Sequence, residues 1–186
     1  MVICHSAPDS ESSLRRKPHC EQIKAKIPAD YPAQETEMKI CGVELTGSDA
    51  VVCLLNLHEQ QYTLPECRVR KLSLPKDHTR EDLQKFQFAF NKLMHDYSVD
   101  RVAIKERMTK GKFAGSAASF KMESAIQLIE ALDVVVLSPA SIKSLLSENP
   151  RPVSFPETGL KGFQEAAFIT AFAAHSLKKM KWPVIG

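Results

Sequence analysis

Short apolar blocks and alternating polar positions fill the chain directly after residue 38. Residues 39–45 and 50–57 are apolar runs separated by the letters TGSD, which are residues that favour a turn. Residues 67–74 alternate apolar and polar side chains, as a strand with one solvated face does. Because the links between these segments are short, we expect three strands that form an antiparallel meander.

A helical period follows these strands. Thr79 is a good N-cap, and apolar side chains then recur at helical spacing: Leu83, Phe86, Phe90, Leu93, Met94 and Tyr97. The remaining pattern predicts a strand at 101–105, a helix at 119–132, a strand at 133–137, a helix from Pro139 to before Pro150 and a helix at 162–179. This order predicts an α/β fold with a five-stranded mixed sheet, in which three antiparallel strands precede parallel strands and helices cover both faces.

Residues 1–37 differ from the rest of the chain. They contain no glycine, four of the eleven prolines and no sustained apolar period, so they bury too little surface to offset the entropy of ordering. We therefore expect a flexible or disordered N-terminal extension at 1–37 and one folded domain at 38–182. Two hypotheses account for the extension: Met38 is the natural start of the protein, or the extension is a genuine flexible tail.

Composition is that of an ordinary globular protein. The 186 residues are 44% hydrophobic and 25% charged, and the net charge of +3 does not by itself indicate a nucleic-acid partner. No apolar run approaches the roughly 20 residues that cross a bilayer, and the first residues do not resemble a signal peptide. The five cysteines form no CxxC pair and are typical of small buried hydrophobes. We expect a cytoplasmic protein without a membrane partner.

Three glutamates lie at positions where a charged side chain requires an explanation. Glu44 lies inside the first apolar strand, Glu106 follows the fourth strand, and Glu165 opens the Ala-rich final helix. An unpaired charge is expensive to bury, so Glu44 requires a partner. Each glutamate also has a simple interpretation: Glu44 caps the end of its strand beside the turn or pairs with a lysine, Glu106 forms a surface ion pair, and Glu165 faces solvent where an acid suits the helix dipole.

Three segments resemble known proteins: CGVEL at 41–45, VAIKERMTKGKFAGSAASFKMESAI at 102–126 and FQEAAFITAFAAH at 163–175. Through them the chain resembles the ribonuclease H-like fold, and within it the RuvC-type Holliday-junction resolvases and a small bacterial family of uncharacterised proteins. The resemblance implies metal-dependent phosphodiester hydrolysis of a structured nucleic acid. It also implies that Glu44, Glu106 and Glu165 are catalytic and hold Mg²⁺ or Mn²⁺, since nucleases of this fold gather carboxylates around two divalent ions.

The chain departs from the resolvase pattern at two places. Lys105 directly follows the apolar run of the fourth strand, where the resolvases have their acid, although strand alternation still puts Glu106 on the face of Val102 and Ile104. The letters KGFQ at 161–164 replace a further acid one turn before the last. Convergence of the three glutamates would favour an enzyme, whereas a lysine at the centre of the site would favour a binding domain.

A basic loop follows the fourth strand. Lys110 and Lys112 flank Gly111, and such a loop can place lysines and backbone N–H groups around phosphates, while Phe113 could stack on a base. The simple interpretation is a solvated loop with Phe113 in the core. We thus predict a metal-dependent nuclease with a nucleic-acid partner. The alternative is a non-catalytic ribonuclease H-like domain that binds nucleic acid or a protein, and a homodimer is compatible with both.

Overall fold

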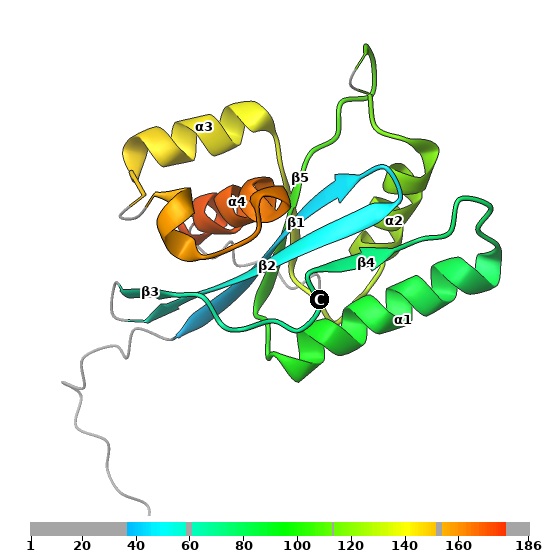
Figure 1. The fold of residues 1–186 in the computed structure, drawn as a ribbon, viewed down its shortest axis with the longest axis horizontal. Coiled ribbons are helices and arrows are strands. Elements are labelled where there is room, and N and C mark those ends of the chain that lie inside the picture. The colour runs from blue at the N-terminus through cyan, green and yellow to red at the C-terminus, as the bar shows by residue number, and fades with distance from the viewer. Residues whose placement is uncertain (1–36, 59–60, 113, 152–153, 178–186) are drawn as a thin grey trace, which may run out of the picture. The chain divides into compact units, whose positions relative to one another are not determined.

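A computed structural model describes residues 37–58, 61–112, 114–151 and 154–177. These residues form one sheet with a pair of helices on each face (Figure 1). The predicted extension at 1–37 lies outside them except for Glu37. Phe113 and the segment 178–182 also lie outside the described residues, so the predictions for these parts of the chain are untested.

The described sheet is mixed, as the sequence predicts. Its strands are β1 Met38–Thr46, β2 Asp49–His58, β3 Gln61–Thr63, β4 Lys71–Ser73, β5 Arg101–Lys105 and β6 Val134–Leu137. β1 to β4 pair antiparallel, whereas β5 pairs parallel with both β1 and β6. The order is β3-β2-β1-β5-β6, with β4 also beside β2, so the sheet of the described residues holds six strands where five are predicted.

The extra strand arises in the segment after β2. β3 has three residues, which is too short to carry a readable period. Of the predicted strand at 67–74, only Lys71–Ser73 pairs with β2. Cys67 and Val69 nevertheless pack against the core. The alternation of apolar and polar residues at 67–74 therefore indicates that one face of the segment is buried. It does not indicate continuous strand pairing with β2.

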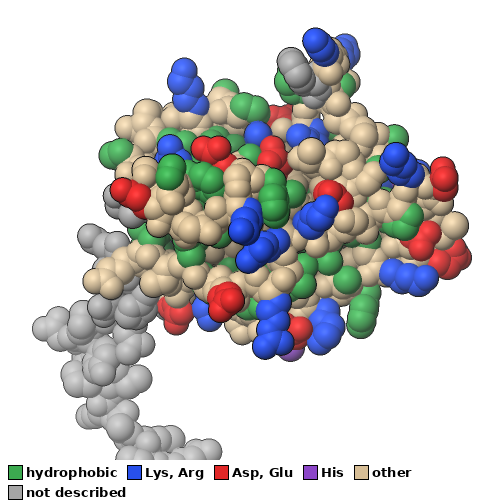
Figure 2. Space-filling view, in the orientation of Figure 1, with side chains coloured by type: hydrophobic (Ala, Val, Ile, Leu, Met, Phe, Trp, Pro, Cys, Tyr) green, Lys and Arg blue, Asp and Glu red, His purple; other side chains and the backbone are tan. Residues whose placement is uncertain are grey.

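Four α-helices and two short 3-10 helices accompany the sheet in the described residues. They are α1 Arg80–Asp96, α2 Ala117–Gln127, α3 Pro139–Glu148, η1 Phe155–Thr158, η2 Gly162–Gln164 and α4 Glu165–His175. α2 ends before the predicted residue 132, because residues 128–132 form a turn that carries Ile129 into the core. The segment between β5 and α2 projects beyond the sheet (Figure 1), and basic side chains stand at its tip (Figure 2).

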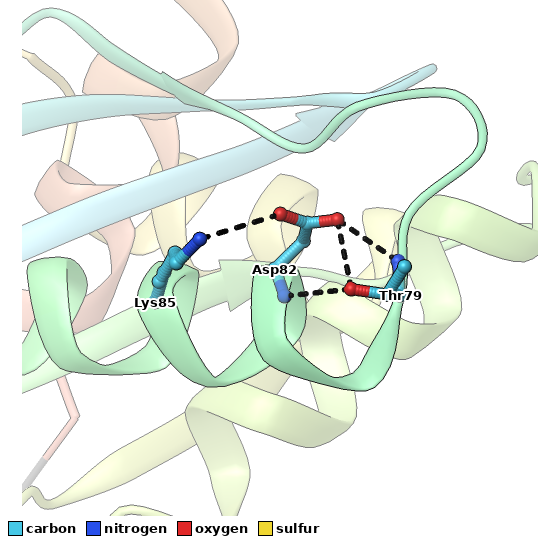
Figure 3. A network of polar contacts seen from close by, with 3 residues as sticks. All are labelled: Thr79, Asp82 and Lys85. Atoms are coloured by element: carbon cyan, nitrogen blue, oxygen red, sulfur yellow. Dashed lines mark hydrogen bonds and ion pairs between the residues drawn. The ribbon is translucent and has the colours of Figure 1, made fainter.

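The N-cap prediction for Thr79 is confirmed. Asp82 N–H donates to Thr79 Oγ1 at 3.3 Å, and the backbone N–H of Thr79 donates to Asp82 Oδ2 at 3.0 Å (Figure 3). This capping box satisfies two backbone donors at the start of α1. The hydrogen bond from the Thr79 backbone lowers the pKa of Asp82 below its ordinary value.

Alternate side chains of β1 belong to two hydrophobic cores, one on each face of the sheet. Cys41, Val43 and Leu45 face α1 and α2, where they meet the buried side chains of Phe86, Phe90, Met94, Met122 and Ile126. The other face packs on α3 and α4, with Ile40, Val51, Leu55, Ile142, Phe168 and Phe172. Fully buried Val, Leu, Ile and Phe side chains each contribute about 1.5–3 kcal/mol, so both helical layers are needed for stability.

Gly42 sets how closely α4 approaches the sheet. A Cβ atom at this position would clash with the backbone carbonyl of Ala167 and would lie 2.7 Å from the backbone nitrogen of Ala171. Glycine is therefore required for the close approach of backbone to backbone, and not for an unusual φ angle. Through this contact, Gly42 positions α4 directly over β1.

No helix among the described residues is long and apolar enough to span a bilayer.

His175, at the end of α4, makes stability depend on pH. Burial lowers the pKa of His175 to about 4, below the roughly 6.5 of an unfolded chain. Between these values the unfolded chain binds a proton that the native ring does not, so the free energy of unfolding falls as the pH falls. Urea unfolding should show a loss of about 1 to 2 kcal/mol between pH 7 and pH 5.

The same measurement on His175→Leu should show a smaller loss, because the titrating ring is absent. His95→Leu is the matched control, since the His95 side chain is 91% exposed, and it should keep the full loss. Equal losses in wild type and His175→Leu would assign the acid sensitivity to other groups.

Candidate functional site

Those predicted site residues that the structure describes lie at one end of the sheet. Parallel pairing puts the carboxyl ends of β1 and β5 side by side, with Val43 opposite Ile104. α4 begins at this end, because Gln164 Nε2 donates to the carbonyl of Val52, the partner of Val43. The loop 106–116 and the start of α3 follow the carboxyl ends of β5 and β6 at the same place (Figure 1).

Glu44 forms an ion pair with Lys105. Glu44 Oε1 lies 3.0 Å from Lys105 Nζ, and the two side chains are 18% and 31% exposed. Both residues directly follow the paired Val43 and Ile104, so they are neighbours on the sheet face that α4 covers. Of the two simple interpretations of Glu44, this contact is the one with a lysine.

By strand alternation, Glu106 belongs to the face of the sheet opposite to that of Glu44 and Lys105. Val102 and Ile104 face α1 and α2, while Ala103 faces α4, so it is Lys105 that lies beside Glu44. Glu106 itself is exposed. Its charge acts on Glu123 of α2: burial raises the pKa of Glu123, Arg107 opposes the increase and Glu106 adds to it. Glu106 therefore lies toward the α2 side of the site.

Glu165 is the exposed first residue of α4. The segment before it is held by Gln164, which is buried and whose side-chain carbonyl accepts from the backbone N–H of Lys161 at 3.3 Å. An acid in the first turn also favours the dipole of α4. The exposed Lys161 and the buried amide of Gln164 occupy the turn where the resemblance implies a further acid.

These residues do not fit a pair of divalent cations. A two-metal site needs carboxylate oxygens that converge from several elements. Here the Glu44 carboxylate binds an ammonium group, and Glu106 and Glu165 are exposed. Within the described ranges, no three His, Cys, Asp or Glu side chains form a group that could hold a metal ion. The metal-binding and catalytic roles of the three glutamates remain untested predictions.

The basic loop is exposed and has an ordered base. Lys110 and Lys112 are exposed, and Gly111 between them has a φ of 92°. The backbone N–H of Gly115 donates to the carbonyl of Met108 at 2.8 Å and closes the loop. Ser116 Oγ donates to Gly47 in the β1–β2 turn at 2.6 Å. The loop therefore presents both lysines to solvent from a base tied to the sheet.

A cavity of about 320 Å³ lies between this loop and the start of α3. Its lining includes Arg107, Thr109 and Lys110 from the loop and Pro139 from α3. Two cationic side chains, a hydroxyl group and one acid, Glu106, therefore border the same space. Such a lining suits an anionic group of a ligand.

Glu123 is a charged residue near the site that no sequence motif indicates. Its Oε2 atom is buried, as is Nε of Arg107, and neither atom has a hydrogen-bond partner among the described residues. Glu123 directly follows the buried Met122 on α2, and that adjacency is the only signal in the sequence. Its proximity to Arg107 depends on how the loop folds back over α2.

Comparison with solved structures supports the fold. The RuvC structure from Thermus thermophilus matches with a TM-score of 0.59 and 12% sequence identity, over 75% of this chain and 94% of that one. The T. thermophilus RuvC in complex with a Holliday junction substrate matches with a TM-score of 0.55 and 11% identity, over 75% and 93%. At these identities the likeness shows a ribonuclease H-like fold and no more.

Sequence comparison gives the family. No curated protein sequence matches the chain. A family model described as "Protein of unknown function (DUF3010)" matches residues 38–174, which include every described strand and all but the last residue of α4. The chain therefore belongs to the DUF3010 family.

Proposed function

We propose that this protein is a ribonuclease H-like domain that binds nucleic acid without hydrolysing it through two metal ions. The observation that carries the proposal is the 3.0 Å contact between Lys105 Nζ and Glu44 Oε1. A divalent cation at Glu44 would have to displace this ammonium group or lie beside it. Like charges at such a short distance repel strongly where water is partly excluded.

The same lysine contributes to a positive surface. Lys105 is followed by Arg107, Lys110 and Lys112, with Glu106 as the one acid between residues 105 and 112. Phosphate contacts are made by lysine and arginine side chains, by hydroxyl groups and by backbone N–H groups. The loop and the cavity beside it supply lysine, arginine and hydroxyl donors on one exposed surface.

The comparisons agree with a nucleic-acid partner. A neighbour of the same fold is solved with a Holliday junction substrate, and it aligns over three quarters of this chain. A protein of this fold can therefore bind a branched DNA. We take branched or duplex DNA as the first ligand to test.

Binding should weaken, and become less sensitive to salt, when the loop loses its lysines. In the double variant Lys110→Ala/Lys112→Ala, the slope of log K against log salt should become shallower by almost two, since each duplex phosphate contact contributes roughly 0.9. Fluorescence anisotropy with labelled four-way junction and duplex DNA in EDTA measures this slope. The control Lys85→Ala/Lys92→Ala removes two exposed lysines of α1 and should leave the slope unchanged.

Identical slopes for the loop variant, the α1 control and the wild type would overturn the assignment of the loop.

A cleavage assay in Mg²⁺ and Mn²⁺ on the same DNA, and on RNA–DNA hybrids, tests the predicted nuclease activity. We expect intact substrates. Cleavage by the wild type that is lost in Glu44→Gln would instead establish a metal-dependent enzyme.

A further inference from the structure

A groove lies between α1 and α2, on the sheet face opposite to α4. Its volume is about 400 Å³, and its apolar lining comes from Leu83 on α1 and from Phe120, Ala125 and Leu128 on and after α2. Gln87 and Ala125 both line the groove, and Gln87 Nε2 donates to the carbonyl of Ala125 at 2.7 Å, which joins the two helices. The groove is therefore a fixed feature of the packed helices.

Two exposed apolar side chains extend the groove onto the surface. Leu128, which lines it, is 73% exposed, and Phe88, one helical turn after the lining residue Gln84 on α1, is 71% exposed. They are the two most exposed large apolar side chains of the described residues. A single exposed apolar residue is ordinary, but two beside one apolar groove are typical of an interaction site.

The opposite end of the groove is cationic. Arg80 and Lys121 line it, both are exposed, and the lining contains no acid. Lys121 Nζ lies 3.0 Å from Nε2 of His78, just before α1, whereas Gln87 meets Ala125 further along. The two helices thus run in the same direction. The cations lie toward the N-terminal side of the groove, and Leu128 lies just after the C-terminal end of α2.

We propose that this groove binds an amphipathic helix of a partner protein that carries an apolar stripe and acidic residues at one end. An elongated apolar groove between two helices accepts apolar side chains at helical spacing. Acidic residues at the end of the stripe that reaches Arg80 and Lys121 would complement both cations. This charge asymmetry sets the direction in which the partner helix lies.

Two synthetic helical peptides test the proposal on the full-length protein. Both carry the same leucine stripe, and they differ only at one end, which holds glutamates in the first and lysines in the second. Fluorescence anisotropy should show that the acidic peptide binds about tenfold more tightly than the basic one, as two exposed ion pairs in place of two repulsive contacts imply. Added salt should reduce this difference.

Variants of the groove should change this preference in defined ways. Arg80→Glu/Lys121→Glu should reverse the order of the two peptides, and Phe88→Ser/Leu128→Ser should weaken both. The control Lys92→Glu/Lys143→Glu makes the same change of charge at exposed positions outside the groove lining and should preserve the wild-type order. Circular dichroism melts verify that the exposed substitutions leave the protein folded.

Three outcomes would overturn the proposal. The first is equal affinity for the two peptides, and the second is an absence of binding by either. The third is a dimer in sedimentation experiments that dissociates in Phe88→Ser/Leu128→Ser, which would make a second copy of the chain the occupant of the groove.

Discussion

Replacing Lys105 by glutamate should lower the melting temperature by about 10 °C in EDTA, and Mg²⁺ or Mn²⁺ should restore much of it. The variant puts a second carboxylate beside Glu44, whose side chain is only 18% exposed. Loss of the cationic partner from a largely buried pair should cost about 2 to 4 kcal/mol, somewhat less than for a fully buried pair. For a chain of this length, each kcal/mol shifts the melting temperature by about 2–4 °C.

The metal response is what distinguishes this variant from a merely destabilised protein. Two neighbouring carboxylates would bind a divalent cation, and a ligand that binds only the native state stabilises it by about 2.7 kcal/mol at a concentration one hundred times its Kd. Lys105→Gln is the control, because it removes the ammonium group without adding an acid. It should be destabilised and should gain nothing from metal.

The wild type is the decisive comparison in this series. Its Glu44 carboxylate is already occupied by Lys105, so its melting temperature should be the same in EDTA and in Mg²⁺ or Mn²⁺. An increase in the wild type as large as that in Lys105→Glu would contradict the proposed function. It would return the three glutamates to the role of metal ligands.

Gly42→Ala adds a single methyl group, and this addition should destabilise the protein more than a methyl group added at any other position near the site. The added Cβ would clash with the carbonyl of Ala167 and lie 2.9 Å from Cβ of Ala171. The nearest of these atoms is backbone in a packed helix, so α4 as a whole would have to move away from β1. Overpacking of this kind costs about 3 kcal/mol or more, or roughly 10 °C of melting temperature.

Gly162→Ala is the matched control for this prediction. A Cβ atom at Gly162 would meet nothing within 4 Å, so the stability should change by only a few tenths of a kcal/mol. Thermal melts followed by circular dichroism measure both variants. A Gly42→Ala variant as stable as Gly162→Ala would mean that α4 is free to shift over β1.

Much of the fold could be read from the sequence because it depends on local periods. The apolar spacing along α1 and its Thr79 cap are properties of neighbouring residues, and both are found as predicted. β5 has the predicted bounds of 101–105 for the same reason. Where pairing has no local period, prediction fails. β3 is three residues long, and Cys67 and Val69 of the segment 67–74 pack against the core without joining the ladder.

The identity of the partner of Glu44 is a tertiary property. Glu44 and Lys105 are separated by 61 positions, and they meet only because Val43 is in register with Ile104 across two parallel strands. A shift of one residue in this register would place Lys105 on the other face and would change the neighbour of Glu44. Alternation along residues 101–106 favoured Glu106 over Lys105, because the sequence does not show which face of this strand turns toward Glu44.

The sequence by itself therefore determined the fold class, the mixed sheet and the set of charged residues at the end of this sheet. These features depend on hydrophobic periods among neighbouring residues and on the order of the strands along the chain. Only the tertiary structure decided which charges meet: Glu44 with Lys105, and Glu123 near Arg107. It also decided that two helices leave an apolar groove with a cationic end. Such contacts depend on register and on helix packing, which join residues far apart in the chain.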